Sequence, residues 1–135
     1  MGETILEVKG LKKHFPVFKG LILAKQTGAI KAVDGIDFTV KRGETFGLVG
    51  ESGCGKTTSA KLVLLQESAT EGSIHFNGND ITHLPPTEKR QHRGLVQAVF
   101  QDPYSSLSPR MKVGRIIAEP IVIQNKVSKE ELNQR

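Results

Sequence analysis

The chain has 135 residues, of which 19 are Lys or Arg and 14 are Asp or Glu, so its formal net charge is +5. This length favours one domain, and a chain that is 37% hydrophobic and 24% charged is too apolar to be intrinsically disordered. One Cys and no Trp exclude a disulfide framework and a Cys-based zinc site within the chain. No apolar run approaches the roughly 20 residues that span a bilayer, and Glu3 and Glu7 precede the first hydrophobic segment, unlike in a signal peptide.

The positive charge is concentrated near the N-terminus. Residues 1–42 hold eight Lys or Arg and four acids, a surplus of +4, which leaves +1 for the rest of the chain. A positive net charge is typical of proteins that bind nucleic acids. Because acids are interleaved with the basic residues and no aromatic ladder accompanies them, the sequence favours a solvated basic surface instead.

Three segments before residue 44 have strand or turn patterns. Residues 4–8 are predicted to form a strand that ends at Gly10. Pro16 and two glycines interrupt the apolar residues between positions 15 and 30, which predicts a hairpin-like excursion or an ordered loop. Residues 36–40 alternate apolar and polar side chains, as a half-exposed strand does.

The middle of the chain predicts a strand, a loop and a helix in direct succession. Residues 44–50 are nearly all apolar or small, which is typical of a strand buried on both faces. Residues 56–66 then have apolar side chains at helical spacing. Residues 73–76 predict a further strand, closed by a turn at Asn77-Gly78.

The last third of the chain predicts mainly helices. Polar residues 87–93 predict a short helix, and residues 95–100 predict a second buried strand. A loop is expected from residue 102 to 109, and residues 113–122 have a helical period that Pro120 is expected to kink or end. Ser128 to Glu131 match a capping box, which predicts the start of another helix.

One motif carries a recognisable chemistry. Residues 50–57 read Gly-Glu-Ser-Gly-Cys-Gly-Lys-Thr and match the phosphate-binding pattern G-x-x-x-x-G-K-[ST]. Its glycines permit positive φ angles that turn backbone N–H groups toward an anion, and the following helix adds its positive end. Lys56 is predicted to reach the β and γ phosphates and Thr57 to ligate Mg²⁺. The alternative is a glycine-rich turn without a ligand, and Cys54 is expected to contribute only its backbone and a small side chain.

Three separated stretches resemble the ATP-binding subunits of ABC transporters. They are residues 47–58, residues 32–36 followed by 41–44, and residues 99–111, of which the last is similar to the Q-loop region of the oligopeptide and dipeptide importers. That branch also has an opening similar to residues 11–17. The similarity runs from Leu6 to Ile121.

The resemblance implies a fold of the α/β class. It implies a partial P-loop NTPase (ABC ATPase) core with an N-terminal antiparallel β-subdomain and the start of the helical subdomain. Residues 1–43 would form the β-subdomain with an excursion at 16–30, residues 44–100 the P-loop core, and residues 101–135 the Q-loop and the start of the helical subdomain.

The resemblance also assigns site residues. ATP would be bound by Gly50, Glu51, Ser52, Gly53, Cys54, Gly55, Lys56, Thr57, Thr58 and Phe15. Phe15 would stack on adenine, and its alternative role is that of a core residue. Thr57 and Gln101 would ligate Mg²⁺, with Gln101 as the Q-loop glutamine; the alternative for Gln101 is a solvent-facing residue at a strand end.

The sequence departs from the family after Gln101. The family's signature motif, second acidic motif and switch histidine are absent, and His14, His75, His83 and His92 all precede Gln101. No catalytic set is complete, so the chain looks like the N-terminal half of a nucleotide-binding subunit. The leading function is the ATP-binding component of a peptide-type ABC importer, whose intact parent couples ATP hydrolysis to transport. The alternative is a truncated, non-catalytic nucleotide-binding fragment.

The resemblance implies partners as well. These are membrane permease subunits, a second homologous nucleotide-binding subunit in a head-to-tail dimer and, indirectly, an extracytoplasmic peptide-binding protein. The resemblance places this chain on the cytoplasmic side of the cell membrane and implies no nucleic-acid partner. Dipeptides, oligopeptides and nickel all remain open as the cargo. Lys12, Lys13 and Lys19 are a hypothesised contact to membrane headgroups or to the permease. Strands 46–49 and 95–100 would lack neighbours, which predicts exposed apolar edges and self-association.

Overall fold

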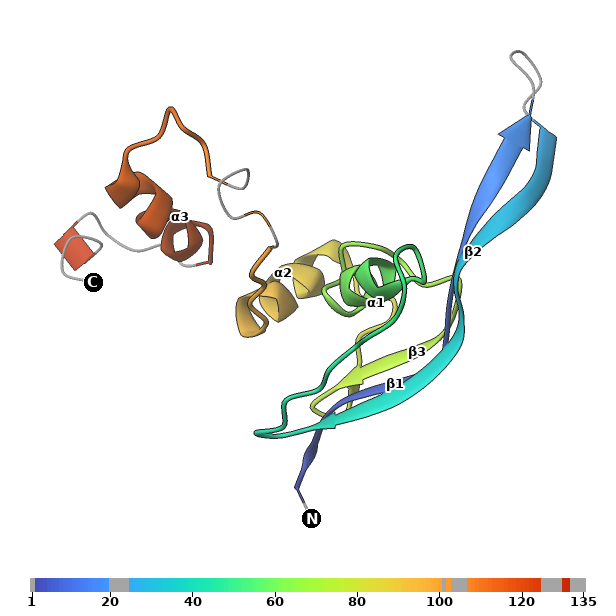
Figure 1. Cartoon of the computed structure of the whole chain (residues 1–135). Coiled ribbons are helices and arrows are strands. Elements are labelled where there is room, and N and C mark those ends of the chain that lie inside the picture. The colour runs from blue at the N-terminus through green and yellow to red at the C-terminus, as the bar shows by residue number, and fades with distance from the viewer. Residues whose placement is uncertain (1, 20–24, 101, 103–106, 125–129, 132–135) are drawn as a thin grey trace. The chain divides into compact units, whose positions relative to one another are not determined.

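The computed structural model describes residues 2–19, 25–100, 102, 107–124 and 130–131 (Figure 1). The chain divides into two compact units, Met1–Pro85 and Pro86–Arg135. No helix among the described residues is long and apolar enough to cross a membrane.

The first unit is built on a four-stranded antiparallel sheet. Its strands β1 (Thr4–Lys19), β2 (Lys25–Lys41), β3 (Glu71–Phe76) and β4 (Asn79–Asp80) lie in the order β2-β1-β3-β4. β1 and β2 pair from Thr4↔Lys41 to Lys19↔Lys25, whereas β3 pairs with β1 only as far as Lys12↔Glu71. The outer part of the β1–β2 hairpin therefore extends beyond β3 as a two-stranded arm (Figure 1).

β1 is longer than the sequence predicted because Gly10 does not end it. Gly10 has a φ of 53°, and the pairing with β2 shifts register between Val8 and Leu11. The backbone N–H of Gly10 donates a hydrogen bond to Oδ1 of Asp37 at 2.7 Å. An irregularity of this kind bends a strand without ending its pairing. The strand predicted at 4–8 and the excursion at 15–30 therefore belong to one hairpin.

The core of the first unit lies between the sheet and α1 (Lys56–Val63). Leu62 of α1 is fully buried. In the sheet, the Oγ1 atom of Thr82 accepts a hydrogen bond from the Ile74 N–H at 2.8 Å. The predicted strand at 73–76, its Asn77-Gly78 turn and the predicted helix are confirmed, although the helix ends at Val63. The buried cluster consists of Val8, Leu11, Val33, Leu62, Leu65, Ile74 and Ile81.

The two predicted buried strands of the P-loop core are not formed. Residues 44–50 and 96–100 have no regular structure, and Leu95 is the last residue of a helix. Val49 is 88% exposed and Val99 is 96% exposed. A strand is stabilised by hydrogen bonds to a neighbour, and no described residue forms a strand beside either segment. The two strands were predicted from the apolar composition of these segments, and the prediction was wrong for both.

The second unit contains α2 (Pro86–Leu95) and α3 (Val113–Gln124). Both helices were predicted, and Pro120 does not end α3, which continues to Gln124. The Arg90 guanidinium of α2 donates a hydrogen bond to the carbonyl oxygen of Ile123 in α3. Glu130 and Glu131 are helical, whereas Ser128 and Lys129 of the predicted capping box lie outside the described residues.

Candidate functional site

The glycine-rich segment at residues 50–55 forms a loop that leads directly into α1. The Cys54 N–H donates to the Glu51 carbonyl at 3.3 Å, which closes a turn, and the helix begins at Lys56. Gly53 and Gly55 have φ angles of 83° and 101°. L-residues rarely adopt such angles, so the shape of the loop explains glycine at both positions.

Gly55 also packs against the sheet. A Cβ atom at this position would lie 2.3 Å from the Ala32 carbonyl oxygen and 3.5 Å from Cγ2 of Val33. Both neighbours belong to β2. Close approach of two backbones requires a residue without a side chain. Gly55 therefore fixes the start of α1 directly against β2.

The N-terminus of α1 is suited to an anion. Gly55 occupies the cap position without a side-chain hydrogen bond, and the first turn holds no acidic residue. The first N–H groups of a helix have no acceptor within the helix, and the helix dipole gives this end a partial positive charge. Donors and charge together favour a phosphate or carboxylate group here.

Lys56 adds a full positive charge at the loop. Its Nζ donates hydrogen bonds to the carbonyl oxygens of Gly50 at 2.8 Å and Glu51 at 2.6 Å, and it lies 3.6 Å from Sγ of Cys54. These three contacts hold the ammonium group against the loop backbone. Lys56 therefore both stabilises the loop and supplies it with a cation.

A cavity of about 130 Å³ lies at this end of α1. It is several times larger than the roughly 30 Å³ that one water occupies in the liquid. It brings together five predicted site residues and Ala32, which the sequence did not single out as a site residue although it lies in one of the stretches that resemble the family. The lining residues are Ala32, Gly53, Gly55, Lys56, Thr57 and Thr58.

Of the residues that the structure describes, the remaining predicted site residues do not line this cavity. Glu51 and Ser52 are exposed on the loop, which Gly50 begins. Phe15 lies in β1 opposite Ile30, with Nζ of Lys13 4.8 Å from its ring centroid. Gln101, the predicted Q-loop residue, lies outside the described residues.

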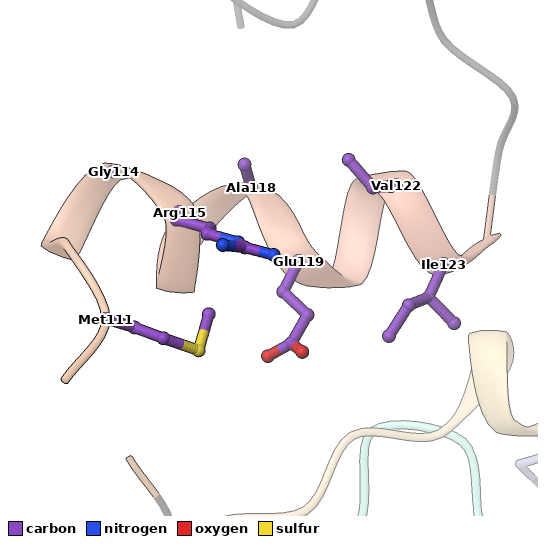
Figure 2. Close-up of a pocket in the computed structure, with 7 residues that line it drawn as sticks. All are labelled: Met111, Gly114, Arg115, Ala118, Glu119, Val122 and Ile123. Carbon is purple, nitrogen blue, oxygen red and sulfur yellow. The ribbon is translucent and has the colours of Figure 1, made fainter. Parts of the chain in front are cut away.

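A larger cavity of about 440 Å³ lies along α3 in the second unit (Figure 2). Its lining residues belong to α3 and to Met111, two residues before the helix, and most are apolar or small. None of its lining residues belongs to the glycine-rich loop or to the predicted nucleotide-binding residues. We therefore assign it no part in nucleotide binding. It is lined by Met111, Gly114, Arg115, Ala118, Glu119, Val122 and Ile123.

Exposed ion pairs hold β1, β2 and β3 together next to the site. Lys12 and Glu71 lie 2.7 Å apart, and this contact raises the pKa of Lys12 and lowers the pKa of Glu71. Asp34 accepts hydrogen bonds from Lys31 at 3.0 Å and from His14, with 2.8 Å between Nε2 and Oδ1. These bonds lower the pKa of Asp34, with that from Lys31 the larger cause. Ala32 lies between Lys31 and Asp34 in sequence. The hydrogen bonds of Asp34 therefore hold in place the part of β2 that contacts Gly55.

Comparison with known proteins identifies the family. Residues 33–134 match the model of the ABC transporter family. The chain belongs to this family. It is 46% identical to the oligopeptide transport ATP-binding protein AppF of Bacillus subtilis, over 98% of this chain and 40% of that protein. It is 41% identical to the dipeptide transport ATP-binding protein DppF of Escherichia coli, over 98% of this chain and 39% of that protein. The chain thus spans about two fifths of the length of these curated relatives.

Solved structures of ABC ATP-binding cassettes have the same fold. A dimeric cassette in a post-hydrolysis state, bound to ADP and Pi, matches with a TM-score of 0.76 at 21% identity, over 96% of this chain and 53% of that one. A second cassette, in its ADP conformation, matches with a TM-score of 0.52 at 28% identity, over 66% of this chain and 30% of that one. These likenesses confirm the predicted fold class, a partial ABC ATPase core with an antiparallel β-subdomain.

Proposed function

We propose that this chain binds ATP with Mg²⁺ as the nucleotide-binding component of an ABC-type peptide importer. The observation that carries the proposal is the cavity at the N-terminus of α1, where Lys56 and the first N–H groups of the helix meet and the first helical turn has no acidic residue. The names of the relatives, which are peptide transport ATP-binding proteins, support the peptide class of cargo.

The residues present fit a triphosphate. The N–H groups at the start of α1 would bind phosphate oxygens, and the Lys56 ammonium would balance their charge as a point cation. Thr57 lines the cavity and offers a hydroxyl to Mg²⁺, which neutralises phosphate charge when bound. Gln101 is the proposed second protein ligand. No group of three or more His, Cys, Asp or Glu that could hold a metal occurs among the described residues, so the proposal leaves most Mg²⁺ ligands to the nucleotide and water.

Lys56 must change partners when phosphate enters. Its Nζ donates to the Gly50 and Glu51 carbonyl oxygens in this structure. An ammonium group has three donors, and the two carbonyl oxygens and Sγ of Cys54 engage all three, so at least one contact must be released before Lys56 can bind an anion. We infer that Lys56 turns at least partly from the loop carbonyls toward the phosphate on binding.

The remaining assignments follow the family. We propose residues 1–43 as the β-subdomain with its excursion at 16–30, residues 44–100 as the P-loop core and residues 101–135 as the Q-loop and the start of the helical subdomain. Phe15 is proposed to stack on adenine. The partners are permease subunits, a second nucleotide-binding subunit and, indirectly, an extracytoplasmic peptide-binding protein, with the chain peripheral on the cytoplasmic side of the membrane.

Hydrolysis belongs to the intact transporter in this proposal. A second candidate function is nucleotide binding without turnover, and one observation favours it for the chain itself: the residues that line the cavity include no carboxylate. Steady-state phosphate release separates the two. Turnover above that of a Lys56→Ala variant would overturn the non-catalytic alternative.

Binding of a fluorescent ATP analogue in the presence of Mg²⁺ tests the proposal. Lys56→Ala is expected to weaken binding roughly thirtyfold, because a charge-assisted hydrogen bond contributes about 1.5–3 kcal/mol. Lys61→Ala is the matched control, since it removes the same charge from an exposed position on the same helix. Equal affinity of the two variants would refute the proposed site.

A further inference from the structure

The outer part of the β1–β2 hairpin, called the arm below, consists of residues 14–19 and 25–31. Its two strands pair with each other as far as Lys19↔Lys25, but β3 pairs with β1 only up to Lys12. Six residues of extended strand span about 20 Å, and Figure 1 shows the arm projecting past β3. An isolated two-stranded ribbon is marginally stable in water, so an arm of this length calls for a partner.

The charge of the arm has one sign. Between Val8 and Val33 the sequence holds six lysines and no Asp or Glu. Four of these lysines are neutralised by acids outside this stretch: Lys9 by Glu7, Lys12 by Glu71, Lys13 by Glu67 and Lys31 by Asp34. The ion pairs of the described residues include neither Lys19 nor Lys25.

Lys19 and Lys25 lie directly opposite each other at the end of the arm. Like charges at opposite positions of an antiparallel pair destabilise the pairing. An anion between the two ammonium groups would remove this repulsion. The sequence suggested Lys12, Lys13 and Lys19 as the contact to a membrane or permease, but the structure engages Lys12 and Lys13 in ion pairs and leaves Lys19 with Lys25.

The arm also exposes apolar side chains on both faces. Opposite residues of an antiparallel pair share a face, and successive residues alternate. Phe15 and its opposite Ile30 therefore lie on one face, together with Val17, whereas Phe18 lies on the other. Ile30 is 62% exposed, Phe18 is 59% exposed and Val17 is 39% exposed.

We propose that the end of the arm inserts into the headgroup region of an anionic lipid bilayer. A folded protein partner would cover one face of the ribbon, whereas a lipid interface surrounds both, as the exposed side chains on both faces require. Val17 and Phe18, which lie beside Lys19 on opposite faces, would enter the acyl boundary, and Lys19 and Lys25 would reach back to lipid phosphates along their apolar stems. This inference does not depend on nucleotide binding.

Flotation with vesicles of phosphatidylcholine, alone or mixed with equal phosphatidylglycerol, tests the lysines. The chain is expected to bind the mixed vesicles and not the neutral ones. The double variant Lys19→Gln, Lys25→Gln is expected to bind about thirtyfold more weakly, because each lysine near an anionic surface contributes about 1 kcal/mol. The control is Lys41→Gln, Lys112→Gln, which removes equal charge from exposed positions outside the arm. No vesicle binding, or equal losses in both variants, would overturn the proposal in favour of a protein partner or a diffuse charge effect.

A fluorescent reporter tests insertion separately from charge. The chain has no Trp, so Phe18→Trp introduces a single indole at the arm, and Phe100→Trp introduces one at another exposed position, where Phe100 is 52% exposed and Phe18 is 59% exposed. Mixed vesicles are expected to shift the emission of Phe18→Trp to the blue and to leave that of Phe100→Trp unchanged. Unchanged emission from Phe18→Trp would contradict insertion even if the chain still floats.

Discussion

The two ends of the glycine-rich loop at residues 50–55 are held in very different ways. At its C-terminal end, α1 buries Leu62 fully, and Gly55 meets the Ala32 carbonyl oxygen of β2. At its N-terminal end, residues 44–50 have no regular structure, and Val49 is 88% exposed. The contrast teaches that apolar residues fix a loop only where the fold supplies a surface or strand for them to pack on.

The same difference determines which groups of the loop are held in place by the rest of the fold. The N–H groups that are proposed to bind an anion lie at the packed end, on α1, so they are held in place before any ligand binds. The Gly50 end is tied to the rest of the loop mainly through the ammonium of Lys56. Three experiments test this difference between the two ends of the loop.

The largest effect is expected from the core side chain beneath the packed end. Leu62→Ala should lower the free energy of unfolding by about 3 kcal/mol, because it leaves a cavity in a fully buried cluster. Val49→Ala should change it by less than about 0.5 kcal/mol, as an exposed side chain does. Urea denaturation measures both. Equal losses would show that the Val49 side chain is packed.

A second, smaller effect is expected where the loop meets β2. Gly55→Ala should cost about 2–3 kcal/mol, since it combines a left-handed backbone with a Cβ that lies 2.3 Å from a backbone oxygen. Gly53→Ala is the control, because Gly53 also has a positive φ but a Cβ there would have nothing within 4 Å. It should cost about 1 kcal/mol. Thermal unfolding compares the variants, and equal costs would mean that the contact with Ala32 is not constraining.

The smallest effect concerns pH and the ion pairs beside β2. The pKa values of Glu71 and Asp34 are lowered in the folded protein, so both carboxylates stabilise the fold at any pH above their ordinary pKa values. This stabilisation is lost as the pH falls through their lowered pKa values. The window lies below about pH 4. The raised pKa of Lys12 places a second loss above about pH 10.

Glu71→Gln should flatten both limbs of the stability profile, because Lys12 loses its partner in the same variant. Denaturant titrations at acid, neutral and alkaline pH measure this. Glu130→Gln, a change at another exposed glutamate, serves as the comparison. A profile for Glu71→Gln that keeps the shape of the unsubstituted protein would show that the exposed pair contributes nothing.

Local signals predicted the packed end of the loop well. The motif placed the start of a helix at Lys56, and Asn77-Gly78 placed a turn after β3, where the structure has both. These features depend on short-range chemistry: glycines that permit positive φ, and residues that begin a helix. Five of the predicted site residues line one cavity for the same reason. Their role in nucleotide binding stays a prediction.

Features that depend on distant partners were missed. Residues 46–49 look like a strand, yet whether a strand forms is decided by a neighbour that local composition does not specify. The length of the β1–β2 hairpin was also missed. Pro16 and Gly28 locally favour a break in the strands, but pairing between β1 and β2 continues through both residues. Ala32 became a site residue only through the fold, since its backbone carbonyl and not its side chain meets Gly55.

The contacts of Lys56 with the loop carbonyls have one more consequence. The loop carries its own counter-ion, so its carbonyl dipoles are screened before any nucleotide arrives and the anion does not meet a bare row of oxygens. If the loop binds phosphate as proposed, entry of the phosphate would be an exchange of hydrogen-bond acceptors around one ammonium group. Such an exchange would keep the number of hydrogen bonds that Lys56 donates nearly constant.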